Sequence, residues 1–429
     1  MEAIALAPPF RPLPIRGMNA LGRQLERLGW SGPRLDEDGL IARATAQVRL
    51  EDFGSESFRP GLRRLLESLE SDARLHSFGR YFAQRQILEL LRHRLRLTHY
   101  RERHPELAGE RVERPLFVIG LPRTGTTLLH ALLTRDSAHR APLSWEVDDP
   151  CPPPQAAGYV TDPRIARAER RFEQLRKLAP GFQSIHPIGA LLPQECIVIT
   201  ACEFYSLRFE MCFNVSGYQE WLVQQDMGPA YRFHRQFLQH LQSRYPAERW
   251  VLKSPGHLGP IDALLAEYPD AMIVQTHRDP LSVIPSVSSL EYVMRAVASD
   301  SVDPAEVGQQ QLRQWPLLLE QGIRARDRHP DRSAQFLDVH FQEILADPLA
   351  CVRRIYSHFD LHLAQDTERR MQAFLRRSPR AGHGTHRYSL ERFGLNADAV
   401  HHAFKGYTER FRVAHEEPEG AALAADDRA

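Results

Sequence analysis

The chain has 429 residues, of which 42% are hydrophobic and 25% are charged, a composition typical of a globular protein. Its 55 lysines and arginines nearly balance its 54 aspartates and glutamates, so the charge gives no reason to expect a nucleic-acid or anionic-membrane partner. The five cysteines form no CxxC pair, which disfavours a disulfide framework or a structural zinc site and fits a reducing cytoplasm. The sequence shows no signal peptide and no apolar stretch of about 18 residues, so we expect a cytoplasmic protein without a membrane span.

Helical patterns dominate the first quarter of the sequence. Residues 1–16 contain four prolines and are expected to form an extended arm. Beyond this arm, apolar residues recur at helical spacing, as in Leu62, Leu65, Leu66 and Leu69. We therefore predict an N-terminal helical region over residues 1–112, built from three or four helices.

The pattern changes after residue 112. Short apolar runs at 115–120, 250–252, 271–276 and 335–339 have the length of buried strands, and helical patterns separate them. Strands that alternate with helices indicate a parallel sheet with helices on both faces. We predict an α/β fold with a P-loop-like parallel sheet flanked by helices over residues 113–365. A C-terminal segment of helices and loops, 366–429, is expected to close the site.

The most specific motif is Gly120-Leu-Pro-Arg-Thr-Gly-Thr-Thr127, which lies between the first predicted strand and an apolar helix. In this arrangement the N–H groups of the first helical turn point at one spot, where the helix dipole adds positive charge. Gly125 lets the backbone approach a phosphate, and Arg123 supplies a fixed positive charge. We therefore predict a phosphate-binding loop formed by Arg123, Thr124, Gly125, Thr126 and Thr127.

This loop departs from the nucleotide P-loop at one position. Its spacing matches G-x4-G-K-[ST], but Thr126 stands where the P-loop has the lysine that reaches the β- and γ-phosphates. The missing lysine argues against hydrolysis of a nucleoside triphosphate. A P-loop kinase or NTPase, and a non-catalytic nucleotide-binding protein on the same fold, stay open as alternatives.

The segment Pro122–Thr127 resembles the 5′-phosphosulfate loop of the sulfotransferase superfamily, Pro-[Lys/Arg]-[Ser/Thr]-Gly-Thr-Thr. With an arginine at position 123, the loop is similar to that of the tyrosylprotein sulfotransferase branch and its bacterial relatives. The resemblance to the superfamily covers residues 116–360. It implies 3′-phosphoadenosine 5′-phosphosulfate (PAPS) as the sulfuryl donor and PAP as the product. The superfamily's 3′-phosphate element is a strand followed by arginine, with a serine eight residues later, and Arg278 and Ser286 have this spacing.

Sulfuryl transfer requires that charge be stabilised at the leaving phosphate. Lys253 directly follows a predicted strand, and sulfotransferases carry a lysine at the matching strand end. The resemblance therefore gives this role to Lys253, together with Arg123 of the loop. The chemistry requires no metal and the sequence shows no metal-ligand spacing such as HExxH, so we expect none.

Two residues compete as the general base that removes the acceptor proton. Glu146 lies in the region where the tyrosylprotein branch has a catalytic glutamate, with a spacing about three residues longer. His257 follows Lys253 by four residues, whereas the cytosolic branch has Lys-x-His. A histidine titrates near neutral pH, whereas a glutamate needs burial to raise its pKa. The sequence leaves both open, with a slight preference for Glu146.

The remaining expectations concern the borders of the site. Phe341 falls where some relatives place an aromatic ring beside the adenine. The basic segment 383–388 is an ordinary loop or, less favoured, a lid over the 3′-phosphate. We expect the acceptor pocket to be built from residues 180–240 and the N-terminal helices. Aromatic residues from Phe182 to Tyr218 are dense in this region, and they line such a pocket or simply form core. The predicted acceptor is a small molecule with a hydroxyl group that the sequence does not identify, and a homodimer stays open.

Overall fold

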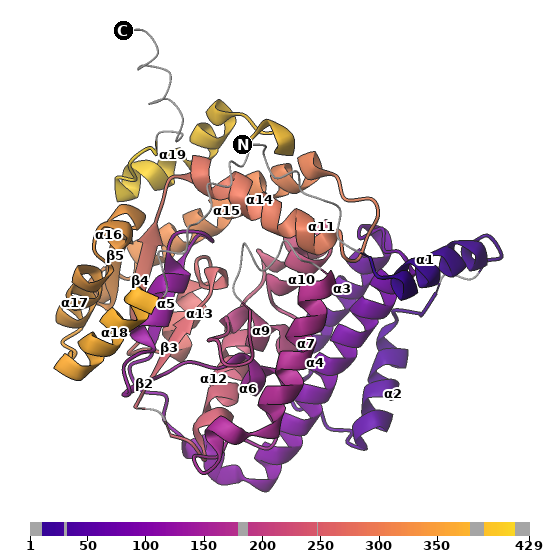
Figure 1. Ribbon diagram of the computed structural model, residues 1–429, viewed down its shortest axis with the longest axis horizontal. Coiled ribbons are helices and arrows are strands. Elements are labelled where there is room, and N and C mark those ends of the chain that lie inside the picture. Colours follow the sequence, from indigo (N-terminus) through magenta and orange to yellow (C-terminus); the bar gives the residue numbers. More distant parts are fainter. Residues whose placement is uncertain (1–10, 30–31, 179–187, 247, 378–389, 417–429) are drawn as a thin grey trace.

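The computed structural model describes residues 11–29, 32–178, 188–246, 248–377 and 390–416 (Figure 1). A five-stranded sheet lies at its centre, with parallel neighbours throughout and the order β2-β3-β1-β4-β5. The strands are β1 Leu116–Gly120, β2 His139–Arg140, β3 Arg249–Lys253, β4 Met272–His277 and β5 Phe336–His340. The predicted α/β fold is confirmed, and the four predicted strands are β1, β3, β4 and β5.

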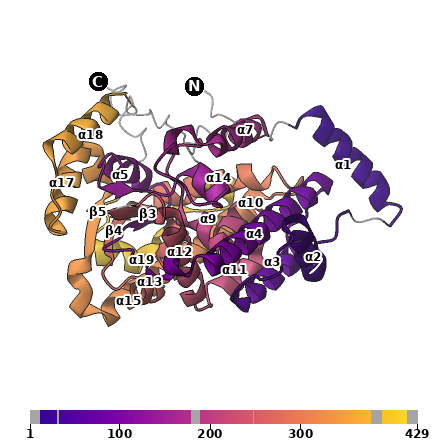
Figure 2. The ribbon, with the colours of Figure 1, turned by 90° about the horizontal axis from the view of Figure 1, so that it is seen from below.

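Alternating side chains of the strands pack into two cores. Leu116 and Val118 of β1 pack with the helices of one face, which are α5 Thr126–Leu133, α17 Pro348–His358 and α18 Gln365–Arg377. Phe117 and Ile119 point to the other face, which is covered by α12 Gly228–Gln242, α13 Ile261–Glu267 and α15 Pro304–Arg328. Figure 2 shows α5 and α18 on one side of the strands and α13 and α15 on the other. The sheet is therefore covered on both faces, as expected for parallel strands.

The N-terminal region is helical in the described residues. Its helices are α1 Leu13–Glu26, α2 Glu37–Val48, α3 Arg59–Ser71 and α4 Ser77–Arg103. The expected extended arm over residues 1–16 is wrong from Leu13 onward, because α1 begins there and prolines are tolerated in a first helical turn. Leu62, Leu65, Leu66 and Leu69 are buried in the same core as the α12 face of the sheet. The division into three domains at residues 112 and 365 stays a prediction.

The remaining described helices lie in the segments that precede, join or follow the strands. The α-helices are α6 Ser144–Asp148, α7 Pro163–Leu178, α9 Cys196–Thr200, α10 Arg208–Cys212, α11 Ser216–Leu222, α14 Pro280–Arg295, α16 Phe341–Ala346 and α19 Ala397–Phe411. Short 3₁₀ helices span Glu56–Phe58, Pro105–Gly109, Tyr159–Thr161, Ala201–Glu203, Pro255–His257, Pro330–Gln335 and Glu391–Phe393. None of the helices within the described ranges combines the length and the apolar character that crossing a bilayer requires.

Candidate active site

The predicted phosphate loop joins β1 to α5. Gly120 has a φ of 150°, and a Cβ atom at this position would lie 2.1 Å from Oγ1 of Thr276 on β4. Gly125 has a φ of 86° and is the residue from which α5 starts. Because both positions combine a positive φ with close neighbours, glycine is required for the chain to turn from the strand into the helix.

Thr124 fixes this loop to the neighbouring strand. Its side chain is fully buried, and its Oγ1 donates to the carbonyl oxygen of Leu121 at 2.7 Å. The same atom lies 2.6 Å from Oγ1 of Thr276. The sequence predicts Thr124 as a phosphate ligand, and this stays a prediction; its hydroxyl bonds within the protein and helps to shape the loop.

The other loop residues surround the start of α5. Arg123 is partly buried and has a φ of 68°, in the left-handed region that is uncommon for residues other than glycine. Thr126 is buried and Thr127 is exposed, and both lie in the first helical turn. The backbone N–H groups of this turn are the donors that an anion would use.

Arg278 follows β4, the strand beside β1, and contacts the loop directly. Its Nη1 donates to the carbonyl oxygen of Arg123 at 2.9 Å, although the two residues are 155 positions apart. Its guanidinium carbon lies 3.9 Å from the centre of the Phe341 ring. Asp279 begins α14 as expected, accepting a hydrogen bond from the N–H of Leu281 at 3.0 Å. The two predicted anion-binding elements therefore meet at the carboxyl ends of β1 and β4.

The rest of the Arg278 guanidinium holds a carboxylate of the same chain. Nε and Nη2 each donate to Glu416 at 2.8 Å, and the hydroxyl of Ser282 donates to the same carboxylate at 2.8 Å. Ser286, the predicted serine, is buried one turn further along α14. The sequence missed Ser282, although serines four residues apart on one helix share a face.

Lys253 ends β3 and forms an ion pair with Glu195, which precedes α9. The two side chains are 4% and 15% exposed, so Glu195 keeps the greater access to solvent. Burial, and after it the charge of Lys253, lowers the pKa of His130 on α5 to about 3. The sequence missed Glu195; its only signal is that it is the single acidic residue between 188 and 202.

Glu146 is fully buried. One carboxylate oxygen accepts from the guanidinium of Arg140, and the other accepts from the N–H of Leu143 at 2.7 Å. The Arg140 guanidinium lies 4.7 Å from the ring centres of Tyr245 and Trp250. In this arrangement Glu146 joins α6 to β2, and a substrate could reach its carboxylate only if these contacts opened.

His257 is also buried and contacts α12, which covers one face of the sheet. Its Nδ1 lies 2.7 Å from the hydroxyl of Tyr231, and its ring meets Phe117 edge-on at 5.0 Å. Burial, followed by the nearby His234, lowers the pKa of His257 well below its usual value, so the ring is neutral. Trp250 and Leu252 of β3 pack in the core on the α12 face, and Val251 packs in the core on the α5 face, so the alternation of side chains assigns Lys253 to the α5 side of the strand.

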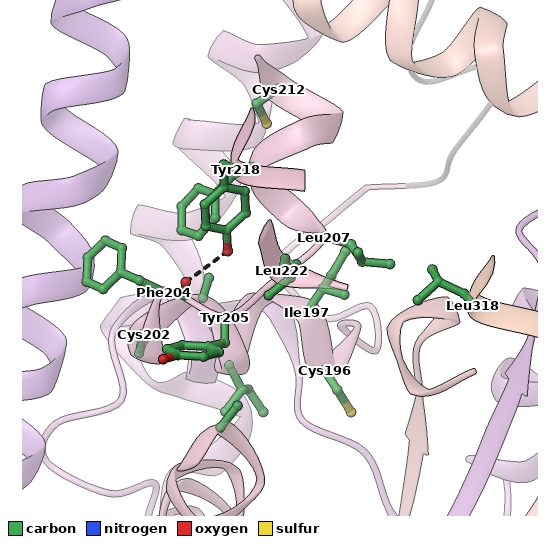
Figure 3. Close-up of a cluster of buried hydrophobic side chains, with 14 of the residues drawn as sticks. Cys196, Ile197, Cys202, Phe204, Tyr205, Leu207, Cys212, Tyr218, Leu222 and Leu318 are labelled. Atoms are coloured by element: carbon green, nitrogen blue, oxygen red, sulfur yellow. Dashed lines mark hydrogen bonds between the residues drawn. The ribbon is translucent and has the colours of Figure 1, made fainter. Parts of the chain in front are cut away.

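A cavity of about 450 Å³ lies beside His257. Ser254 and Cys196, the chain neighbours of Lys253 and Glu195, both line it. Its apolar walls include Ile197, Leu207, Leu222, Met227 and Leu318. Figure 3 shows Leu318 of α15 pointing toward Leu207 across this space. The cavity therefore has a mostly apolar surface, with polar and charged side chains such as Asp226, Gln321 and Arg324 also in its lining. It lies close in the chain to the Lys253–Glu195 pair.

Most of the aromatic residues expected in an acceptor pocket are core. Phe204, Phe209, Phe213 and Tyr218 are buried, and Tyr218 donates its hydroxyl hydrogen to the Phe204 carbonyl oxygen at 2.8 Å (Figure 3). Tyr205 does line the cavity, but no residue of the described N-terminal helices does. Phe182 and the candidate lid at 383–388 lie outside the described residues.

The chain is similar to known sulfotransferases. The sequence profile of the sulfotransferase family matches residues 115–365. The sulfotransferase STF1 of Mycobacterium tuberculosis H37Rv is 34% identical, with a TM-score of 0.78 over 87% of this chain and 99% of STF1. The sulfotransferase STF9 of Mycobacterium avium is 30% identical, with a TM-score of 0.80 over 89% of this chain and 98% of STF9.

A third relative is the omega-hydroxy-beta-dihydromenaquinone-9 sulfotransferase Stf3 of Mycobacterium bovis. It is 26% identical over 262 residues, which are 58% of this chain. The match spans 63% of the length of that curated relative. The profile covers more than half of the chain, and the two solved structures match over nearly their whole length. The chain therefore belongs to the sulfotransferase family, whose members transfer sulfuryl groups.

Proposed function

We propose that this chain transfers the sulfuryl group of PAPS to a hydroxyl group of a lipophilic small molecule. The contact between Arg278 and the carbonyl oxygen of Arg123 carries the donor assignment, because it joins two anion-binding elements. A helix N-terminus suits the 5′-phosphosulfate and an arginine fork suits the 3′-phosphate. ATP and GTP have a 3′-hydroxyl and give Arg278 no anion to bind. This difference, with Thr126 in the lysine position, favours PAPS over a triphosphate.

Each predicted donor ligand other than Thr124, whose hydroxyl bonds within the protein, has a proposed part in this site. The N–H groups around Gly125, Thr126 and Thr127 would bind the phosphosulfate, with Arg123 adding charge. Arg278 would bind the 3′-phosphate with the help of the serines on the same face of α14, Ser282 and Ser286. Phe341 would hold the Arg278 guanidinium flat and border the adenine.

In the proposed reaction the acceptor oxygen forms a bond to sulfur as the bond from sulfur to the bridging phosphate oxygen breaks. PAP leaves with the electron pair of that bond, and the acceptor proton passes to a base. Lys253 and Arg123 would face the charge that develops on the leaving phosphate. For this, Lys253 would first have to leave its ion pair with Glu195. The partly exposed carboxylate of Glu195 would then lie beside the reacting atoms. We therefore add Glu195 to Glu146 and His257 as a candidate base, and we favour it.

The cavity beside His257 is the proposed acceptor site. Its apolar walls suit a lipophilic alcohol, and it is lined by the chain neighbours of Lys253 and Glu195. Stf3, a relative, is named for an omega-hydroxylated menaquinone, which supports a hydroxylated lipophilic acceptor here. A cytoplasmic location and a homodimer remain predictions.

The proposal is tested first by binding. Titration calorimetry of the purified protein with PAP, ATP and GTP, with and without magnesium, should show tighter binding of PAP that needs no magnesium. Transfer from labelled PAPS should then be screened over hydroxylated lipophilic acceptors. A magnesium-dependent preference for a triphosphate would support the kinase or NTPase alternative. Binding of PAP without transfer to any acceptor would support the non-catalytic alternative.

A further inference from the structure

The Arg278 guanidinium already binds an anion, which is a carboxylate of the same chain. The carboxylate of Glu416 accepts two parallel hydrogen bonds from Arg278 and a third from Ser282, all at 2.8 Å. The N–H of Glu416 donates to Asp279 at 2.8 Å. Arg278 and Glu416 are 22% and 16% exposed, so solvent reaches the pair only in part. A carboxylate that binds an arginine fork through two oxygens has the geometry of a bound phosphate.

Residues 412–416, which we call the C-terminal strap, directly follow α19, and Val413 packs in the core beside it. The helix α19 ends at Phe411, the φ of 51° at Arg412 turns the chain, and the N–H of Val413 donates to the carbonyl oxygen of Thr408 at 3.0 Å. The hydroxyl of Tyr407 on α19 accepts from the N–H of Arg278 at 3.2 Å. α19, yellow in Figure 1, packs on α14 and α15. The far end of the strap is attached to the site through Glu416.

We propose that Glu416 is an internal competitor of the donor nucleotide and that the C-terminal strap closes the 3′-phosphate site when no nucleotide is bound. This inference rests on the proposed function of Arg278. The Nε and Nη2 atoms that hold Glu416 cannot bind a phosphate at the same time, so the carboxylate must leave before the 3′-phosphate enters. Nη1 stays bonded to the carbonyl oxygen of Arg123 and the guanidinium stays on Phe341, so Arg278 is oriented for either anion.

Competition of this kind has a measurable consequence. If the strap is closed nine-tenths of the time, the apparent affinity for PAP is about tenfold weaker than in a protein whose strap is open. A nucleotide that lacks the 3′-phosphate gains nothing from Arg278 and need not displace Glu416. Adenosine 5′-phosphosulfate is such a nucleotide.

The test is Glu416→Gln in the full chain, with Glu416→Ala as a second variant. By calorimetry both should bind PAP about tenfold more tightly than the unmodified protein and adenosine 5′-phosphosulfate equally well. Glu409→Gln, which removes the same charge from an exposed position on α19, should leave both affinities unchanged. In hydrogen exchange, PAP should remove the protection of the Glu416 amide, and adenosine 5′-phosphosulfate should not.

Two results would overturn the competitor proposal. One is that both Glu416 variants bind PAP no more tightly than the unmodified protein. The other is that PAP increases the protection of the Glu416 amide, as it would if the strap closed over the nucleotide. Arg278→Ala separates this failure from failure of the proposed function. Selective loss of PAP binding keeps Arg278 as the 3′-phosphate ligand, whereas equal weakening of PAP and adenosine 5′-phosphosulfate removes it.

Discussion

The three candidate bases differ in the contacts and the burial of their side chains. These differences separate the expected roles of Glu146, His257 and Glu195. Glu146 is bonded through both oxygens inside the protein. His257 is buried, and its lowered pKa makes it a weak base. Glu195 is ion-paired with Lys253 and is partly exposed. A general base must reach the acceptor hydroxyl directly or through one water, which favours Glu195.

Glu195→Gln should therefore lower single-turnover transfer by about 10²–10⁴-fold, the usual contribution of a positioned base, and leave PAP affinity near its original value. Glu146→Gln should act mainly on stability, because it breaks a buried ion pair and leaves Arg140 without its charge partner, at a cost of about 3 kcal/mol. Urea denaturation, PAP calorimetry and single-turnover transfer of both variants check this.

Two outcomes would contradict the assignment to Glu195. If Glu146→Gln keeps its stability and PAP affinity but loses transfer, Glu146 is the base, as the sequence slightly favours. If His257→Ala abolishes the acidic limb of the pH profile of transfer, the base is His257. Lys253→Ala should lower turnover in every case, because the charge on the leaving phosphate develops whichever group takes the proton.

The residues that the sequence missed share a physical reason. Glu195 meets Lys253 from 58 positions away, and Glu416 meets Arg278 from 138 positions away. Contacts of this kind depend on how the chain folds back and leave no local pattern. The loop at Gly120 and Gly125 was predictable because a turn with positive φ demands particular residues within a few positions.

At the scale of elements, the longer strands were predictable because each is a short local run of buried residues. β1, β3, β4 and β5 are runs of five or six residues in which nearly every side chain is buried or partly buried, and such runs stand out as apolar sequence. β2 has only the two residues His139 and Arg140, which are polar and too few to show a period. The start of α1 was missed because prolines suit a first helical turn as well as an extended arm.

The junction of α10, α14 and α15 contains a buried charge cluster that should make stability depend on pH. Glu210 accepts from Gln314 at 2.7 Å, and Glu291 accepts from Arg295 at 2.6 Å and from Gln311 at 2.8 Å. Burial raises the pKa of Glu291 to about 7 and raises the pKa of Glu210 well above its usual value. Because one guanidinium cannot balance two buried carboxylates, the folded protein keeps a proton here.

Between pH 4.5 and about 7 the folded protein therefore binds more protons at Glu291 than the unfolded chain does. The free energy of unfolding should fall as the pH rises through this range. Glu291→Gln removes this titration, so its loss of stability over the same range should be smaller by about 1–3 kcal/mol. Urea denaturation across the range checks this, with Glu320→Gln on the exposed side of α15 as the control. Parallel curves for Glu291→Gln and the unmodified protein would show that Glu291 does not titrate there.

At the scale of the whole molecule, positive charge gathers at the carboxyl ends of three neighbouring strands. Arg123 follows β1, Lys253 ends β3 and Arg278 follows β4, and the N-terminus of α5 adds its dipole. These groups can neutralise the negative charge of a phosphosulfate and a 3′-phosphate without a divalent cation. Transfer should therefore survive EDTA, and added magnesium should not stimulate it. Complete loss in EDTA with rescue by magnesium would instead point to a triphosphate.

The cavity depends on the assembly of distant segments, and for this reason sequence reasoning located only part of it. The region 180–240 was expected to line an acceptor pocket, and residues between Cys196 and Tyr231 do line the cavity. Its other walls come from residues 254–263 and from Leu318 on α15, and not from the N-terminal helices as expected. The segments that form this wall are separated in the sequence and meet only because α12, α13 and α15 cover the same face of the sheet.

If this cavity binds the acceptor, filling it with a larger side chain should slow transfer to the acceptor and leave the affinity for the donor nucleotide unchanged. Met227 is partly buried and lines the cavity, so Met227→Trp should lower kcat/KM for the acceptor by about 10²-fold, because the hydroxyl can no longer reach the reacting position. PAP affinity should not change, since the ligands proposed for PAP lie at the ends of β1 and β4. Leu317→Trp adds the same ring at a 48% exposed position on α15 and should leave both quantities unchanged. Normal acceptor kinetics in a folded Met227→Trp protein would show that the acceptor binds elsewhere.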